Sequence, residues 1–529
     1  METMKRRTYA SRVTTGALGL ALISLAACSS GESTTGTPAP GSSAGASSAL
    51  VFVNNAGDGT LTSVALRGDS NNEVLKPGTN GEPNPIPAAE FGNVALGDMQ
   101  MTEGDWVFVN LGAADKVAAI DVKTAAIPVR EVNLPTGTRP VHIYRSENDR
   151  EVVWIMNDGD DRTSTPGDDL VNCNNPARVG GPVVGGSVTA VHNSHLGPGA
   201  VPPRVLGTTC ILADGHKVAA FSSGAGVPKR VFVSSETAGE IAVIDDQEGT
   251  GTYRQMIYRI DLCNQSKENG LQTPATCNSE DATGTTPFTP NNSAPHGIRW
   301  SKLTKKIYSL QEGYQEIAEI DPVAVGTSGA QVITKKFDLS GTSYTGYGIS
   351  PDGRYLLLRG ETTNPEQAVK LGVIDLSATT PAVADLDIPV LNGATNGSFQ
   401  TGGSSFKFSP NGKRLYFLVG NSNSVTVTKK DRLFAFDTST LSATPPALTL
   451  VPSGEIPLLQ TGRHSMDIYA EEAGEAKYVV VSNRGAAGSL SIINAIDNTI
   501  KDTVTVGTNP GAVLVYRAGA VQAGNQASN

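Results

Sequence analysis

The stretch KYVVVSN at 477–483 is followed by GSLSIIN at 488–494, TIKDTVTVG at 499–507 and NPGAVLVY at 509–516. Each piece is a short run rich in β-branched residues and bounded by glycine, asparagine or proline. This is the pattern of β-strands joined by tight turns. The four pieces therefore predict four antiparallel strands, and the rest of the chain repeats their order.

The first two pieces recur as a strand pair, or hairpin, at eight places. The hairpins lie at 50–66, 106–121, 152–192, 230–245, 306–321, 354–375, 414–437 and 477–494. A second element, which we term the inner strand, opens with turn residues and continues into a short strand. Its copies lie at 92–100, the weakest of them, and at 139–146, 215–222, 295–301, 345–353, 404–412, 464–470 and 510–516. Repetition of one small unit indicates a repeat architecture rather than several separate domains.

The two ends of this array predict how it closes. The array begins at residue 49 with the second and third strands of a unit and ends with an inner strand. The last strand must complete the first sheet, since otherwise an open sheet edge would remain. We therefore predict an all-β fold, a β-propeller of eight four-stranded blades over 49–520, followed by a disordered tail at 521–529. Seven blades remain an alternative if the copy at 50–100 is irregular.

These residues resemble the YVTN-type β-propeller repeat. The matching features are strands such as RVFVSS and EIAVID within 230–245 and the turns SPDG at 350–353 and SPNG at 409–412. The resemblance covers roughly residues 50–517. The eight-blade count is also similar to the haem-carrying propeller of periplasmic cytochrome nitrite reductases, which implies haem as a candidate cofactor. Such folds host unrelated activities, so the resemblance predicts shape better than function.

The N-terminus looks like the signal peptide of a bacterial lipoprotein. Basic residues up to Arg12 precede an apolar stretch at 16–27 that is too short to span a bilayer as a mature helix. Leu-Ala-Ala then precedes Cys28, as in a lipobox, although a chance cysteine after an ordinary signal is the alternative. We expect 1–27 to be removed, Cys28 to carry the lipid and 28–48 to form a flexible tether. This predicts a location in the bacterial cell envelope, with the outer membrane favoured by the serines after Cys28.

The charge of the chain excludes one class of partner. The formal net charge is −10, and it becomes −13 without residues 1–27. A nucleic-acid partner has no electrostatic support in such a chain. Contact with a membrane is expected through the N-terminal lipid only.

Four insertions fall on one face of the predicted ring, which we term the top face. They lie at 74–91, 157–186, 264–294 and 419–430. Long loops on a rigid scaffold are where binding residues usually lie. The leading functional hypothesis is therefore a propeller that binds a ligand or a partner protein through this face.

The cysteines other than Cys28 form an even set, Cys173, Cys210, Cys263 and Cys277. In an exported protein such a set favours disulfides. Three pairings are possible, and Cys173–Cys210 with Cys263–Cys277 requires the least rearrangement. A metal–thiolate site is the alternative, without support from a Cys-x-x-Cys spacing.

Four histidines, His142, His216, His296 and His464, lie at or near the starts of inner strands. Inner strands line the central channel, so these side chains are candidates for binding a ligand, a transition metal or haem iron at its mouth. Structural capping of the blades and acid–base catalysis are the alternatives. The positions differ by one or two residues between copies, and in a strand an offset of one reverses the side chain. We therefore expect that not all four point inward.

Two other groups are weaker candidates. His192 takes the place of the aspartate that ends the equivalent strand in other blades, which indicates a structural role, and His195 shares its turn on the opposite, bottom face. The acidic residues Asp158 and Asp160 have a spacing suited to calcium, but the match to an EF-hand loop lacks its closing glutamate. A solvated acidic loop is the other interpretation.

The sequence leaves three functions open. The first is the ligand- or partner-binding lipoprotein, the second a metal- or haem-associated redox protein that uses the channel histidines, and the third a lactonase-like hydrolase. Motifs for covalent haem attachment, a phosphate-binding loop and a nucleophile elbow are all absent from the sequence. An enzymatic role is therefore not indicated by any motif.

Overall fold

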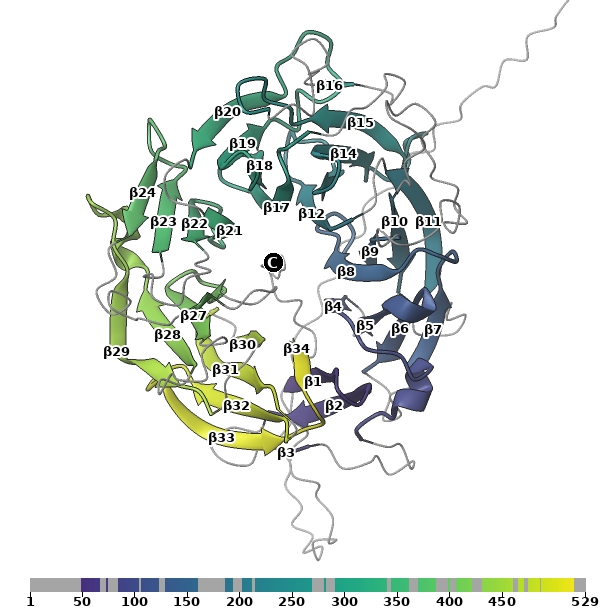
Figure 1. The fold of residues 1–529 in the computed structure, drawn as a ribbon, viewed down its shortest axis with the longest axis vertical. Coiled ribbons are helices and arrows are strands. Elements are labelled where there is room, and N and C mark those ends of the chain that lie inside the picture. Colours follow the sequence, from purple (N-terminus) through teal and green to yellow (C-terminus); the bar gives the residue numbers. More distant parts are fainter. Residues whose placement is uncertain are drawn as a thin grey trace, which may run out of the picture. The chain divides into compact units, whose positions relative to one another are not determined.

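The eight-blade prediction is confirmed. The computed structural model describes residues 49–517 except 67–72, 75–83, 104–105, 123–128, 160–185, 194–201, 212–214, 269–279, 282–290, 340–343, 361–369, 387–397, 400–405, 421–430, 460–464, 471–473 and 486. Eight antiparallel sheets form a ring, and the seven-blade alternative is not supported (Figure 1). The predicted signal, Cys28, the tether and the tail at 521–529 lie outside the described residues.

Within each of the first four blades, the strands are given from the inside of the ring outward. In blade 1 the strands are β34 (Pro510–Arg517), β1 (Ala49–Asn55), β2 (Thr60–Ala65) and β3 (Glu73–Val74). In blade 2 they are β4 (Met99–Thr102), β5 (Trp106–Leu111), β6 (Lys116–Asp121) and β7 (Val129–Asn133). In blade 3 they are β8 (Pro140–Arg145), β9 (Val152–Asn157), β10 (Gly186–His192) and β11 (Arg204–Ile211). In blade 4 they are β12 (Lys217–Ser222), β13 (Arg230–Ser235), β14 (Glu240–Asp245) and β15 (Met256–Asp261), with the short β16 (Glu280–Asp281) at the rim.

The last four blades have the same plan. In blade 5 the strands are β17 (Pro295–Ser301), β18 (Lys306–Gln311), β19 (Glu316–Ile320) and β20 (Ile333–Asp338). In blade 6 they are β21 (Tyr344–Ile349), β22 (Tyr355–Gly360), β23 (Lys370–Asp375) and β24 (Val383–Leu386). In blade 7 they are β25 (Ser398–Phe399) and β26 (Phe406–Phe408), which both pair with β27 (Arg414–Gly420), then β28 (Arg432–Asp437) and β29 (Thr449–Pro457). In blade 8 they are β30 (Met466–Ala470), β31 (Ala476–Asn483), β32 (Ser489–Asn494) and β33 (Thr499–Thr505).

The ring closes as the sequence predicts. β34 pairs antiparallel with β1, with Val515 opposite Val51, so the C-terminal strand is the inner strand of blade 1. Alternate side chains of β34 enter different cores. Leu514 packs with residues of blades 1 and 2, whereas Val515 packs with residues of blades 8 and 1. The closing strand therefore joins three blades.

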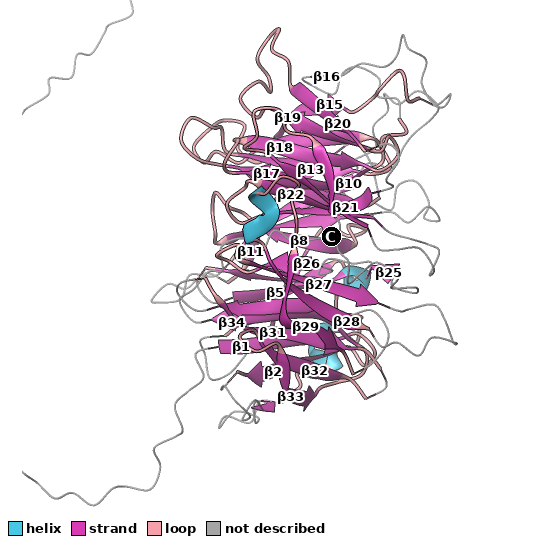
Figure 2. Cartoon of the chain, turned by 90° about the vertical axis from the view of Figure 1, so that its left-hand side faces the viewer, coloured by secondary structure: helices cyan, strands magenta, loops and turns pink. Residues whose placement is uncertain are grey.

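Helical turns are short and few in the described residues, and strands dominate the side view (Figure 2). The turns are η1 (Ala88–Phe91), η2 (Gly112–Ala114) and η4 (Ser439–Ser442). None of the helices in the described part of the chain has the length and apolar character needed to cross a membrane.

The weakest predicted inner strand, at 92–100, is misplaced. The strand begins only at Met99, and the first two residues of the predicted copy, Gly92 and Asn93, adopt left-handed φ angles of 68° and 59° at the end of η1. Such angles do not fit an extended strand. Part of the neighbouring insertion, 74–91, packs into the core and is not a solvent-exposed loop, since Phe91 is fully buried between blades 1 and 2.

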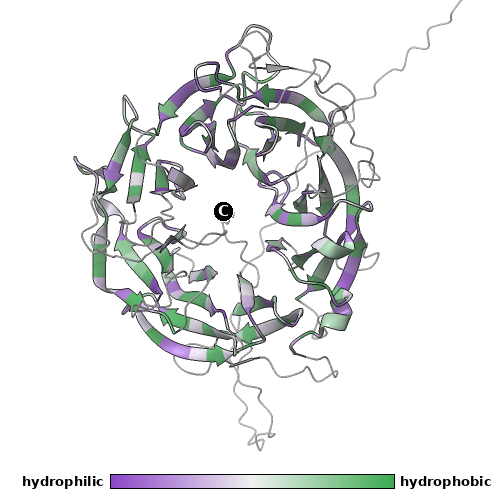
Figure 3. Cartoon of the chain, viewed as in Figure 1, coloured by the Kyte–Doolittle hydropathy of each residue, from purple (hydrophilic) through white to green (hydrophobic). Residues whose placement is uncertain are grey.

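Burial follows the position of a strand within its blade. Second strands such as β5 and β9 are buried at every position, because each blade packs between two neighbours. Outer strands such as β33 are largely exposed, with Val504 turned into the core. Hydrophobic segments accordingly lie along the strands around the ring (Figure 3).

Aspartates end several third strands and fix the turns that follow. The side chains of Asp245, Asp321, Asp375 and Asp437 each accept a hydrogen bond from the backbone N–H two residues later, at 2.8–2.9 Å. This is the Asx-turn geometry predicted from the sequence. Consecutive strands of a blade run antiparallel. The inner strand therefore begins on the top face, and the third strand, like the inner strand, ends on the bottom face.

Candidate functional site

The structure brings three of the four candidate histidines together. His142 of β8, His216 just before β12 and His296 of β17 come from the adjacent blades 3, 4 and 5. His142 Nε2 lies 3.3 Å from His216 Nδ1, with ring centres 4.7 Å apart. The ring centre of His216 is 4.8 Å from that of His296. We term these three residues the histidine cluster; His464 lies outside the described residues.

Irregularities in two inner strands bring the rings into contact. The register between β8 and β9 shifts between Pro140 and His142, and the register between β17 and β18 shifts between Pro295 and Ile298. A β-bulge redirects the side chains beside it. The one-residue offset in the sequence therefore does not separate these three histidines.

A carboxylate holds the histidine at each end of the cluster. His142 Nδ1 donates to Asp98 Oδ2 at 2.5 Å, and His296 Nδ1 donates to Glu312 Oε1 at 2.7 Å. Neither carboxylate was predicted from the sequence. Asp98 lies in the loop before β4, and Glu312 follows β18, so only the packing of neighbouring strands brings them to the histidines.

The electrostatic environment shifts the pKa of the central histidine and the pKa values of the two end histidines in opposite directions. Burial opposes the charged form of His142, but the charge and hydrogen bond of Asp98 outweigh it and raise the pKa of His142. The hydrogen bond to Glu312 raises the pKa of His296 against the effect of burial. Burial, followed by the charges of His142 and His296, lowers the pKa of His216 to about 3. His216 is therefore a neutral imidazole between two histidines that hold protons more strongly.

A buried lysine lies next to the cluster. The side chain of Lys217 is fully buried, and its Nζ donates to the carbonyls of Asn157 and Gly215 at 2.8 and 2.6 Å. Its Nζ also lies 3.7 Å from Asp158 Oδ1. Burial raises the pKa of Asp158, against the opposing effect of Lys217. Asp158 thus faces Lys217, whereas Asp160, its partner in the calcium hypothesis, lies outside the described residues.

The cluster has the chemistry of a ligand site that is held from behind. In each end histidine the carboxylate contacts Nδ1, and Nε2 is the nitrogen that it does not occupy. His216 Nε2 is buried and has no hydrogen-bond partner among the described residues. Imidazoles fixed through Nδ1, as His142 and His296 are, are suited to bind a metal ion through Nε2 or to relay a proton.

The remaining candidates fall elsewhere. His192 ends β10 on the bottom face, at the opposite end of blade 3 from His142, and His195 lies outside the described residues. Cys210 lies in β11 and Cys263 follows β15. Cys173 and Cys277 lie outside the described residues, so the disulfide pairing stays a prediction.

Comparisons with known proteins find similarity of fold. No protein-family model matches the chain, and no curated protein matches it. The solved structure of dihydro-heme d1 dehydrogenase NirN in complex with DHE is 13% identical, with a TM-score of 0.47, and the match covers 90% of this chain and 75% of that one. A periplasmic gluconolactonase of Pseudomonas aeruginosa is 13% identical, with a TM-score of 0.44 and coverage of 88% and 98%. Apo AztD from Citrobacter koseri is 11% identical, with a TM-score of 0.45 and coverage of 89% and 99%.

Proposed function

We propose that the protein is a lipid-tethered propeller of the bacterial cell envelope that binds a divalent transition-metal ion at its histidine cluster. The observation that carries the proposal is the 3.3 Å spacing of His142 Nε2 and His216 Nδ1. Two nitrogens that bind one tetrahedral Zn²⁺ at about 2.0–2.1 Å lie about 3.3–3.4 Å apart. The pair thus has the separation that a shared ion requires.

The surroundings of the pair support the same interpretation. A carboxylate on the Nδ1–H of a histidine fixes its orientation and increases the basicity of Nε2, as is common behind metal-binding histidines. Asp98 has this place behind His142, and Glu312 has it behind His296. His216 needs no proton removed before it binds, because its pKa is lowered to about 3. An ion would replace only the proton between His142 and His216.

Other parts of the proposal rest on the sequence. The basic and apolar N-terminal segment before Cys28 supports the tether and the envelope location. The strands on either side of the insertion at 157–186, β9 and β10, meet it on the same face as His142. This arrangement supports a partner or ligand that contacts the top face beside the bound ion. Haem iron is the second candidate for the cluster, since imidazole is a common axial ligand of haem iron.

Zinc titration by calorimetry tests the proposal on the full chain, purified in detergent and stripped of metal. His142→Gln and His216→Gln are each expected to lower the affinity for one equivalent of Zn²⁺ at least about 100-fold. Lys116→Gln, a change at an exposed ion pair in blade 2, is the control and should bind as the wild type does. Equal Zn²⁺ binding by the wild type and both histidine variants would refute the metal site, and a haem absorption band lost in those variants would replace it with haem.

A further inference from the structure

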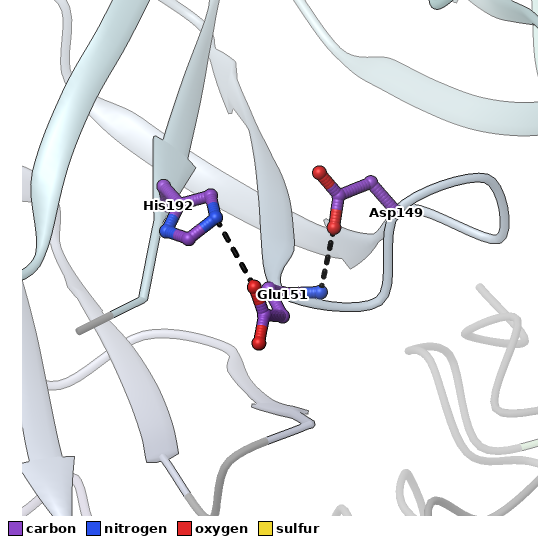
Figure 4. A group of neighbouring side chains, drawn as sticks. All are labelled: Asp149, Glu151 and His192. Atoms are coloured by element: carbon purple, nitrogen blue, oxygen red, sulfur yellow. Dashed lines mark hydrogen bonds and ion pairs between the residues drawn. The ribbon is translucent and has the colours of Figure 1, made fainter. Parts of the chain in front are cut away.

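A second group of metal-ligating side chains lies at the bottom of blade 3 (Figure 4). Asp149 and Glu151 come from the turn between β8 and β9, and His192 ends β10. One ligand atom from each of the three lies within 4.8 Å of the other two. The group draws on two segments about 40 residues apart, which the pairing of His192 with Val152 brings together.

The contacts of His192 show which of its nitrogens faces the carboxylate. His192 Nδ1 lies 2.7 Å from the carbonyl oxygen of Asn193, and a carbonyl only accepts, so Nδ1 carries a proton. His192 Nε2 faces Glu151 Oε2 at 3.3 Å. In the neutral ring both of these atoms carry lone pairs. A cation shared with Glu151 makes the contact favourable, and a ring held through Nδ1–H to a carbonyl is a common arrangement for a metal ligand.

The group is held on a rigid part of the ring. The Asn193 side chain is buried and donates to Thr102 Oγ1 and to the carbonyl of Glu103 in blade 2. The Asn193 backbone N–H donates to the carbonyl of Glu151 at 2.9 Å. These bonds join the end of β10 to the turn that carries Glu151 and to the neighbouring blade. These bonds therefore hold the backbone at the end of β10 against the backbone of Glu151.

The same turn positions Asp149. The backbone N–H groups of Asn148 and Asp149 donate to Ser146 Oγ, and Asp149 Oδ1 accepts from the N–H of Glu151 at 3.1 Å. The His192 and Glu151 side chains are 16% and 34% exposed, so an ion from solvent reaches them. Water can complete the coordination at such an open site.

We propose that Asp149, Glu151 and His192 form a second cation site for a divalent ion that accepts both carboxylate oxygen and imidazole nitrogen, of the class of Mn²⁺ and Zn²⁺. Two carboxylates with one imidazole are a ligand set that such ions take. The site is distinct from the histidine cluster, because it lies at the opposite end of blade 3 and uses none of its residues. A bound ion would link the β8–β9 turn to the end of β10 and stabilise the seam between blades 2 and 3.

Mn²⁺ binding to the full chain tests this site, with free Mn²⁺ counted by electron paramagnetic resonance. The wild type is expected to bind Mn²⁺ and to unfold at a higher temperature when the ion is present. Glu151→Gln and His192→Gln should each weaken the binding at least about tenfold, and Asp149→Asn should do so while it retains an acceptor for the Glu151 N–H. Glu147→Gln is the matched control, because it removes a carboxylate of the same turn that lies outside the group.

Any of three results would overturn the proposal. One is an equal loss of Mn²⁺ affinity in Glu147→Gln and Glu151→Gln, which would show attraction by general acidic charge. Another is wild-type binding in all three site variants, and the third is no binding by the wild type itself. Thermal unfolding without metal identifies any variant that fails to fold, and the remaining variants then decide the outcome.

Discussion

His142 Nε2 lies 3.3 Å from His216 Nδ1, although the two residues are 74 positions apart and belong to different blades. The contact exists because consecutive inner strands lie side by side around the channel, and because a β-bulge turns His142 toward its neighbour. A propeller can therefore assemble imidazoles that no local spacing in the sequence reveals.

The first prediction concerns the carboxylate behind His142. Asp98→Asn keeps the size of the side chain but removes the charge that polarises the ring, so zinc affinity should fall about 10- to 100-fold. Calorimetric titration measures the change. Glu131→Gln, which neutralises an exposed carboxylate paired with Lys116, should leave the affinity unaltered, and an unaltered affinity in Asp98→Asn would mean that Asp98 does not support a ligand.

The second prediction concerns the bulge that carries His296. Gly297 has a φ of 142°, and a Cβ there would lie 3.2 Å from Tyr347 Cε1. Gly297→Ala should therefore shift His296 and weaken zinc binding while the ring remains folded. Gly207→Ala is the matched control, since a Cβ at Gly207 meets nothing within 4 Å. Wild-type affinity in Gly297→Ala would show that the bulge does not position the ligand.

The third prediction concerns the closure of the ring. Leu514 of β34 is 4% exposed and packs in the core shared by blades 1 and 2. Leu514→Ala should lower the free energy of unfolding by about 2–5 kcal/mol, as expected for a buried leucine. Leu303→Ala, at a turn residue that is 49% exposed, should change it by about 0.5 kcal/mol or less. Denaturant unfolding compares the two, and similar values would mean that β34 contributes little to closure.

The fourth prediction concerns the pH dependence of stability. Burial raises the pKa of Asp261 to about 7, against the hydrogen bonds that its Oδ1 accepts from the Cys263 N–H and from Asn291. The folded state then holds a proton that the unfolded chain releases near pH 4, so the contribution of Asp261 to stability falls as the pH rises from about 4 to about 7. Asp261→Asn keeps an acceptor and removes the charge. It should raise the unfolding temperature at pH 8 and change it little at pH 4.

A carboxylate whose pKa is lowered rather than raised provides the control for this pH experiment. Hydrogen bonds from Ser439 lower the pKa of Asp437. The stability that Asp437 contributes is present above the pKa of the unfolded chain and is lost as the pH falls through its folded value. Asp437→Asn should therefore lower the unfolding temperature at pH 8. A lower unfolding temperature at pH 8 in Asp261→Asn as well would contradict the assignment of Asp261.

The sequence predicts the strands and their closure because each blade repeats one local pattern. Runs such as 477–483 and 230–235 are β-branched and bounded by turn residues, and the structure has β31 and β13 there. The copy at 92–100 is the exception. Its apolar residues suggest a strand, but Gly92 and Asn93 form a left-handed turn and the strand begins only at Met99.

The candidate sites could be predicted only in part. The sequence identifies His142, His216 and His296 by their place before inner strands, but their carboxylate partners depend on tertiary packing. The group at the bottom of blade 3 is missed for a similar reason. His192 stands where other blades have an aspartate, which favours a structural role, whereas Asp149 and Glu151 join it only through the register of β9 with β10.

Metal content tests the central claim most directly. The full chain and its His142→Gln/His216→Gln double variant would be purified from an oxidising cell envelope without chelator, then compared by elemental analysis and visible absorption. We predict that the wild type carries about one equivalent more of a transition metal than the double variant. Equal metal content in the two proteins, unchanged after reconstitution with Zn²⁺ and without a haem band, would contradict the account.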